Sequence, residues 1–150
     1  MIAFIGSFTL WWIYFDRSAA AGRRVIAAAT DPGQLGISAY MYFHVPMVAG
    51  IIMLAGADQL AIAHPNAKTT VASAALILGG PALYLIGNGA FVRALWDRVP
   101  RSRVVAILAL GALAPLALVS STLALLGAAT LVVLGIALGD TPAVLRESKV

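Results

Sequence analysis

The stretch that decides the fold is residues 104–139, which read VVAILALGALAPLALVSSTLALLGAATLVVLGIALG without one charged residue. A single helix of these 36 residues would be about 54 Å long, whereas the hydrocarbon core of a bilayer is about 30 Å thick. Two antiparallel helices fit better, over about 104–119 and 122–139, with Ser120 and Ser121 at the turn and Pro115 bending the end of the first. The run therefore predicts two membrane-spanning helices.

The rest of the chain agrees with this interpretation. Of its 150 residues, 61% are hydrophobic and 11% are charged, whereas about 25% of the residues of a soluble domain are charged. Three more apolar runs cover about 1–16, 37–63 and 70–96. We therefore expect an all-α membrane protein, with a bundle of about five transmembrane helices in a single domain over residues 1–150, surrounded by a lipid bilayer.

The connection between the first two spans has its own pattern. Residues 19–29 are rich in alanine and contain Arg23 and Arg24, which predicts a juxtamembrane helix between the first two spans. Asp31 followed by Pro32 is typical of a helix start. Residues 18–22 also resemble the cleavage site of a signal peptide, but no basic residue precedes the apolar run, as a signal peptide requires.

The distribution of the basic residues predicts the orientation. Five spans place nine of the ten basic residues on one side, which are Arg17, Arg23, Arg24, Arg93, Arg98, Arg101, Arg103, Arg146 and Lys149. Only Lys68 falls on the other side. Because cytoplasmic loops carry an excess of basic residues, we expect the N-terminus outside and the C-terminus in the cytoplasm, across a bacterial inner membrane.

Several classes of function are disfavoured by the composition. The net charge is +4, but the basic residues form short clusters between apolar runs rather than a stripe with aromatics, so we expect no nucleic-acid partner. The chain has no cysteine, and the common catalytic motifs are missing. We therefore expect no enzyme, no catalytic residue, no cofactor and no metal site.

Polar residues inside the spans are the candidate functional residues, because they are costly at membrane depth. A hairpin turning near residue 67 brings His44 level with Asn88, and Gly50 level with Tyr84. Pro46 should kink the helix and free a carbonyl near His44. The sequence thus predicts an intramembrane polar cluster of Tyr40, His44, Tyr84 and Asn88, with a direct or water-bridged contact between His44 and Asn88. The cluster either holds the helices together or binds a proton or solute.

Two further features leave alternatives open. Asp58 lies about 21 Å along the helix from His44, so the two cannot touch. Asp58 is predicted at an outer vestibule, although contact with the outer headgroups or with another polypeptide segment also fits. Gly80 and Pro81 in the third span are compatible with a broken helix of the kind that lines transporter sites.

Four ordered blocks carry a family resemblance. They are LWWIYFD (10–16), YFHVPMVAGI (42–51), AIAHP (61–65) and GGPALY (79–84), the last leading to FVR (91–93). Together they resemble the C-terminal part of the bacterial low temperature requirement A (LtrA) family. Full-length members are roughly twice as long, so the resemblance implies part of a longer architecture and a partner in an N-terminal half or another membrane subunit.

The family has no settled biochemical activity, and its name refers to growth in the cold. The resemblance therefore implies a membrane protein of undefined activity, linked to low-temperature growth or envelope adaptation. The layer of His44, Tyr84 and Asn88 adds the hypothesis that the protein transports or senses small solutes or protons. The alternatives are a structural or assembly subunit without transport and a membrane-embedded enzyme that modifies lipids.

Overall fold

The computed structural model describes residues 1–15, 19–117 and 119–147, and the described part is a helical bundle. The helices in chain order are α1 (Ile2–Phe15), α2 (Ala19–Ala27), α3 (Pro32–Ile37), the π-helical turn η1 (Ser38–Tyr42), α4 (His44–Ala63), α5 (Val71–Trp96), α6 (Arg101–Ala112), α7 (Ala114–Ala117) and α8 (Thr122–Glu147). The prediction of an all-α bundle is confirmed. The predicted end of the first span at residue 16, Arg17, Lys149 and the side chains of Arg23 and Arg146 lie outside the described part.

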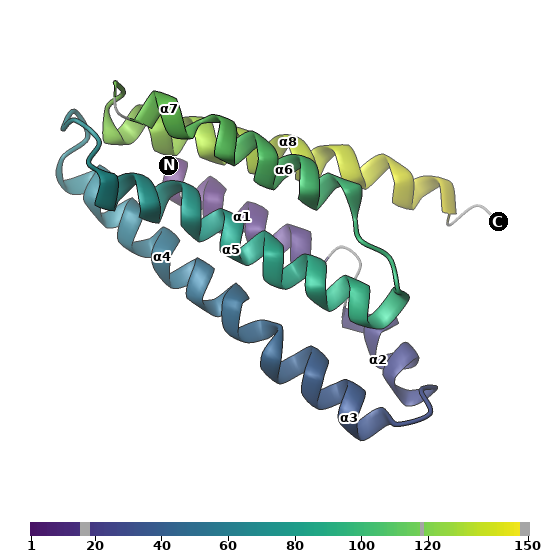
Figure 1. The fold of residues 1–150 in the computed structure, drawn as a ribbon. Coiled ribbons are helices and arrows are strands. Elements are labelled where there is room, and N and C mark those ends of the chain that lie inside the picture. Colours follow the sequence, from purple (N-terminus) through teal and green to yellow (C-terminus); the bar gives the residue numbers. More distant parts are fainter. Residues whose placement is uncertain (16–18, 118, 148–150) are drawn as a thin grey trace.

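The helices pack as two antiparallel hairpins with α1 beside them (Figure 1). One hairpin is α4 against α5, the other is α6 and α7 against α8, and α1 contacts α8, α4 and α5. The loops after α4 and α7 meet at one end of the bundle, where Lys68 and Ser121 form an isolated β-bridge. The other end carries the exposed side chains of Arg24, Arg93, Arg98 and Arg101 and is called the basic end here.

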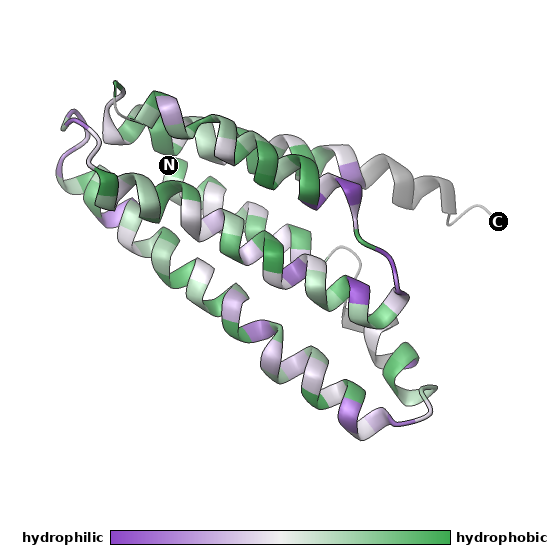
Figure 2. Cartoon of the chain, viewed as in Figure 1, coloured by the Kyte–Doolittle hydropathy of each residue, from purple (hydrophilic) through white to green (hydrophobic). Residues whose placement is uncertain are grey.

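Among the residues that the structure describes, three helical segments are long and apolar enough to cross a membrane by length and composition. They are Pro32–Ala63, Val71–Trp96 and Thr122–Asp140, while the apolar helix Ile2–Phe15 is shorter. Figure 2 shows hydrophobic residues along these helices and hydrophilic residues gathered in the connections at both ends. Since apolar side chains cover the outer faces, the chain is built as a multi-pass membrane protein.

The helix that contains the second predicted span begins earlier than expected, at Pro32 rather than near residue 37. Asp31 is its cap, because the Asp31 carboxylate accepts a hydrogen bond from the backbone N–H of Gln34 at 2.9 Å. Pro32 fits the first turn, where a backbone N–H has no helical partner to lose. The predicted helix start at these residues is confirmed.

Prolines explain where the other helices break. The helix that starts at Arg101 ends at Ala112, and the short α7 begins just before Pro115, so the predicted bend is confirmed. Ser121 then caps α8 by accepting a hydrogen bond from the N–H of Ala124 at 3.3 Å. By contrast α5 continues through Pro81, so the alternative of a broken helix at Gly80 and Pro81 is wrong.

The two helices α4 and α5 approach each other most closely at glycines. A methyl group at Gly50 would lie 2.6 Å from the carbonyl oxygen of Gly80 and 2.7 Å from the backbone nitrogen of Tyr84. A methyl group at Gly87 would lie 2.7 Å from a side-chain carbon of Met47. Small residues let backbones meet at such distances, and the predicted pairing of Gly50 with Tyr84 is confirmed.

Candidate functional site

The π-helical turn before α4 positions His44. Its extra residue leaves the carbonyl of Ala39 able to accept a hydrogen bond from Nδ1 of His44, at 3.0 Å. Pro46 lies in the first turn of α4, where proline is tolerated. The kink predicted at Pro46 is instead a π-helical turn just upstream of it. The carbonyl near His44 is that of Ala39. Turns of this kind occur frequently at functional sites.

The second ring nitrogen of His44 faces α1. Nε2 lies 3.1 Å from the hydroxyl oxygen of Tyr14. Because a carbonyl can only accept, Nδ1 carries the proton, so Nε2 of the neutral ring accepts a hydrogen bond from the Tyr14 hydroxyl. The rings of Tyr40 and Phe91 enclose the imidazole, each with its centroid 5.4 Å away. His44 is thus held by α1, η1 and α5 together.

Tyr84 ties α5 to α1 one helical turn away from this group. Its side chain is buried and its hydroxyl donates a hydrogen bond to the backbone carbonyl of Leu10 at 2.6 Å. Leu10 lies one turn before Tyr14 on α1. Tyr84 therefore contacts α1 one turn away from the His44 group. Its hydrogen bond fixes the position of α1 along the axis of α5.

A charged cluster occupies the interior of the basic end. Nε of Arg103 donates a hydrogen bond to Oδ1 of the fully buried Asn88 at 2.9 Å. Nη1 of Arg103 forms an ion pair with the carboxylate of Asp140 and donates a hydrogen bond to Oγ of Ser102 at 3.2 Å. The Arg103 side chain is 8% exposed and that of Asp140 is 23% exposed. Arg103 on α6 thus joins α5 to α8.

The predicted contact between His44 and Asn88 is not a direct hydrogen bond, and its water-bridged form stays a prediction. Within residues 1–15, 19–117 and 119–147, the side chain of His44 bonds to Tyr14 and Ala39, whereas Asn88 bonds to Arg103. Of the α5 residues, it is Phe91 that meets the imidazole. Residues three apart differ by about 60° around a helix, so Asn88 is at the right depth but turned toward α6. The antiparallel register of α4 and α5 determines which residues lie at the same depth. Tertiary packing determines which neighbouring helix each side chain faces.

Sequence reasoning missed three members of the site. Arg103 and Asp140 carried a signal, because a turn near residues 120 and 121 places them at about the same depth on neighbouring antiparallel helices. Arg103 was assigned to the basic loop instead, with the other arginines. Tyr14 offered no comparable signal. A long connection separates α1 from α4, so the sequence does not determine which residues lie next to Tyr14.

Asp58 lies in the other half of α4. Its residue is 9% exposed, and within the described part of the chain its buried Oδ1 has no hydrogen-bond partner. Asp58 therefore faces the interior of the bundle, and the alternatives of contact with the outer headgroups or with another polypeptide segment stay predictions. Its assignment to an outer vestibule stays a prediction.

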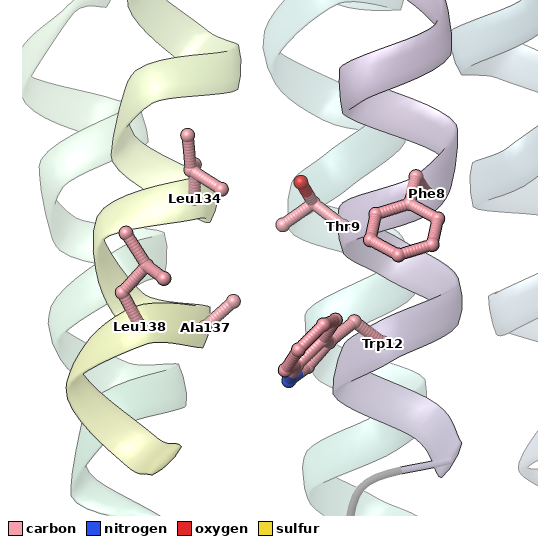
Figure 3. Close-up of a pocket in the computed structure, with 6 residues that line it drawn as sticks. All are labelled: Phe8, Thr9, Trp12, Leu134, Ala137 and Leu138. Atoms are coloured by element: carbon pink, nitrogen blue, oxygen red, sulfur yellow. The ribbon is translucent and has the colours of Figure 1, made fainter. Parts of the chain in front are cut away.

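An apolar pocket lies between α1 and α8. Phe8, Thr9 and Trp12 line one side, and Leu134, Ala137 and Leu138 line the other, around a volume of about 130 Å³ (Figure 3). Because its lining is almost entirely hydrocarbon, the pocket suits an apolar group and offers no polar anchor for a water-soluble substrate.

The described residues contain no group of three or more His, Cys, Asp or Glu side chains that could hold a metal ion. The imidazole of His44 is grouped with the phenols of Tyr14 and Tyr40, and the guanidinium of Arg103 is paired separately with Asp140. This set can bind and release a proton and can form hydrogen bonds.

Comparisons with known proteins add the family. The sequence profile described as "Bacterial low temperature requirement A protein (LtrA)" matches residues 1–138. An uncharacterized protein of Rhizobium meliloti (strain 1021) is 31% identical over 102 residues, which cover 68% of this chain and 24% of that protein. The match thus spans about a quarter of the relative's length. No solved structure matches.

Proposed function

The chain belongs to the bacterial low temperature requirement A (LtrA) family, and we propose that it is a non-enzymatic protein of the inner membrane that senses or transports protons or small solutes. The proposed site is the polar layer, defined here as Tyr14, Tyr40, His44, Tyr84 and Asn88. The family is described as a low temperature requirement protein, so the proposed function is linked to growth at low temperature. The basic end faces the cytoplasm in this proposal, following the excess of arginine there.

One observation carries the proposal, namely the placement of His44 between a fixed acceptor and a reversible partner. The carbonyl of Ala39 accepts from Nδ1, and the Tyr14 hydroxyl contacts Nε2. Histidine is the side chain whose unperturbed charge change falls between pH 5 and 8. When Nε2 gains a proton it becomes a donor, so the Tyr14 oxygen must change from donor to acceptor. Protonation thereby rearranges the contact between α1 and α4.

The side chains around His44 favour a response to protonation that is confined to the contact between His44 and Tyr14. The groups that face the imidazole are Tyr14 from α1, Tyr40 from η1 and Phe91 from α5. None of these three side chains carries a charge at neutral pH. A proton or a small hydrogen-bonding solute that reaches the layer then changes the position of α1 directly.

Proton flux in proteoliposomes tests the transport form of this proposal. The chain is reconstituted with a pH-sensitive dye inside the vesicles, and an imposed pH gradient is allowed to dissipate. We expect faster dissipation than in empty vesicles, with the excess lost in His44→Gln. The matched control is His64→Gln, because His64 is the other histidine and is exposed at the end of α4. Equal loss in both variants would contradict a specific role for His44.

The form of the proposal in which the protein senses protons needs a second measurement. Tryptophan fluorescence of the reconstituted chain is recorded between pH 5 and 8, since Trp11 and Trp12 lie on α1 close to Tyr14. A transition present in wild type and His64→Gln but missing in His44→Gln supports sensing. A profile that is identical in all three proteins, together with no excess flux, would reject both forms.

A structural or assembly subunit is the second candidate. The observation that favours it is the set of cross-links from Tyr84 to Leu10 and from Arg103 to Asn88 and Asp140, which hold four helices together. The partner would be another membrane subunit or the remainder of a longer chain. If His44→Gln lowers only thermal stability and the vesicles show no flux, this candidate is preferred. Lipid turnover in the same vesicles would instead favour a lipid-modifying enzyme.

A further inference from the structure

The amide of Asn88 has a fixed direction and a donor without a partner. A guanidinium can only donate, so the atom of Asn88 that faces Nε of Arg103 must be the oxygen Oδ1. The amide nitrogen Nδ2 then points the other way. Asn88 is 0% exposed, and Nδ2 has no acceptor among the residues that the structure describes. Buried polar groups are nearly always hydrogen-bonded, to protein or to ordered water.

The residues that flank Asn88 on α5 both contact α1. Tyr84 and Phe91 lie one turn before and one turn after Asn88 on nearly the same face of the helix. Both contact α1, Tyr84 through the Leu10 carbonyl and Phe91 through the Tyr14 ring, with centroids 6.2 Å apart. Because Oδ1 is directed to α6 and both flanking residues contact α1, we infer that Nδ2 lies on the side of α1.

We propose that an internal water molecule binds between Asn88 and Tyr14, accepting a hydrogen bond from Nδ2 and contacting the Tyr14 hydroxyl. A buried water usually forms about three hydrogen bonds, and this position offers a donor and a phenolic oxygen that already bonds to His44. The water would join the contact between His44 and Tyr14 to Asn88 and the Arg103 cluster, whose Asp140 carboxylate is partly exposed at the basic end.

The consequence for His44 rests on the proposed function. If protonation reverses the Tyr14 hydrogen bond, the water that contacts Tyr14 must reorient, and the amide of Asn88 responds. Hydrogen bonds in such a network polarise one another, so the Arg103 cluster and His44 would act as one unit rather than as two separate structural contacts.

Selective labelling can observe this water directly, because the chain has only two asparagines, Asn66 and Asn88. The chain is labelled with ¹⁵N-asparagine and placed in lipid nanodiscs, and Asn66→Ser identifies the remaining side-chain amide as that of Asn88. We expect cross-peaks from the Asn88 amide protons to a bound water resonance. Cross-peaks only to aromatic protons, or none to water, would overturn the proposal.

A pair of variants then tests the second partner of the water. Tyr14→Phe should reduce the water cross-peak of Asn88 at least threefold, whereas Tyr42→Phe, at an exposed tyrosine, should leave it unchanged. An undiminished cross-peak in folded Tyr14→Phe would place the water elsewhere and overturn the proposal. These readouts do not depend on flux, so a failure of the proposed function and a failure of this inference give different results.

Discussion

Nε of Arg103 lies 2.9 Å from Oδ1 of Asn88, and both residues are at least nine-tenths buried inside the basic end of the bundle. An arginine at the start of a membrane helix ordinarily extends its charged head to the interface. Arg103 instead turns inward, because Asn88 and Asp140 offer it acceptors on two neighbouring helices. The same contact orients the Asn88 amide and thereby determines which of its atoms lacks a partner.

Removing this arginine should destabilise the bundle strongly. Arg103→Met removes the cation that pairs with the Asp140 carboxylate and the donor to Oδ1 of Asn88, and breaking a buried pair on one side costs about 3 kcal/mol. Denaturant unfolding in detergent micelles, followed by circular dichroism, measures the change. Arg103→Lys should recover only part of the loss, because an ammonium cannot reproduce the fork of a guanidinium. A change below about 0.5 kcal/mol, the range of ordinary surface substitutions, would show that the cluster contributes little.

The double variant Arg103→Met with Asp140→Leu separates the contribution of the ion pair to stability from the contribution of side-chain packing. Replacing both partners by apolar groups removes the uncompensated charge, so we expect it to regain at least about half of the lost stability. If the double variant is as unstable as the sum of the single variants, the two side chains are not coupled.

Tyr84 gives a smaller and more local prediction. Tyr84→Phe removes the hydroxyl that bonds to the Leu10 carbonyl and should lower the free energy of unfolding by about 1 kcal/mol. Tyr42→Phe is the matched control, since Tyr42 is 70% exposed. The same unfolding assay applies to both variants. Equal effects would mean that the hydrogen bond between α5 and α1 does not contribute to stability.

Gly50 tests the close approach of α4 and α5. In Gly50→Ala the new methyl group would meet backbone atoms of α5 at 2.6 and 2.7 Å, so the helices must separate. Overpacking of this kind costs about 1–3 kcal/mol. Gly135→Ala is the control, because a methyl group there meets nothing within 4 Å. The thermal midpoint should fall in the first variant and stay or rise in the second, since alanine favours helices.

Orientation is open to direct measurement, because the chain contains no cysteine. Lys68→Cys and Arg101→Cys each introduce one thiol, at opposite ends of the bundle. In intact cells a membrane-impermeant maleimide should label the first and not the second, as the excess of basic residues at one end predicts. Labelling of both thiols, or of Arg101→Cys alone, would contradict the proposed orientation.

The sequence by itself determined that the chain is a helical membrane protein and approximately where its helices lie. Charge-free runs of membrane length admit few alternatives, because every backbone polar group in lipid must be bonded within a helix or a closed barrel. Local chemistry at Asp31, Pro32, Pro115 and Ser121 also fixed the ends of helices. Antiparallel register correctly placed Gly50 against Tyr84.

Only the tertiary structure decided which polar side chains face one another. His44 was recognised from the sequence, but its partner Tyr14 belongs to a helix whose position depends on packing rather than on a short loop. Asn88 was placed at the right depth and yet faces Arg103, because a rotation of about 60° separates one neighbour from another. Depth follows from counting residues along a helix, whereas rotation about its axis depends on how all the helices pack together.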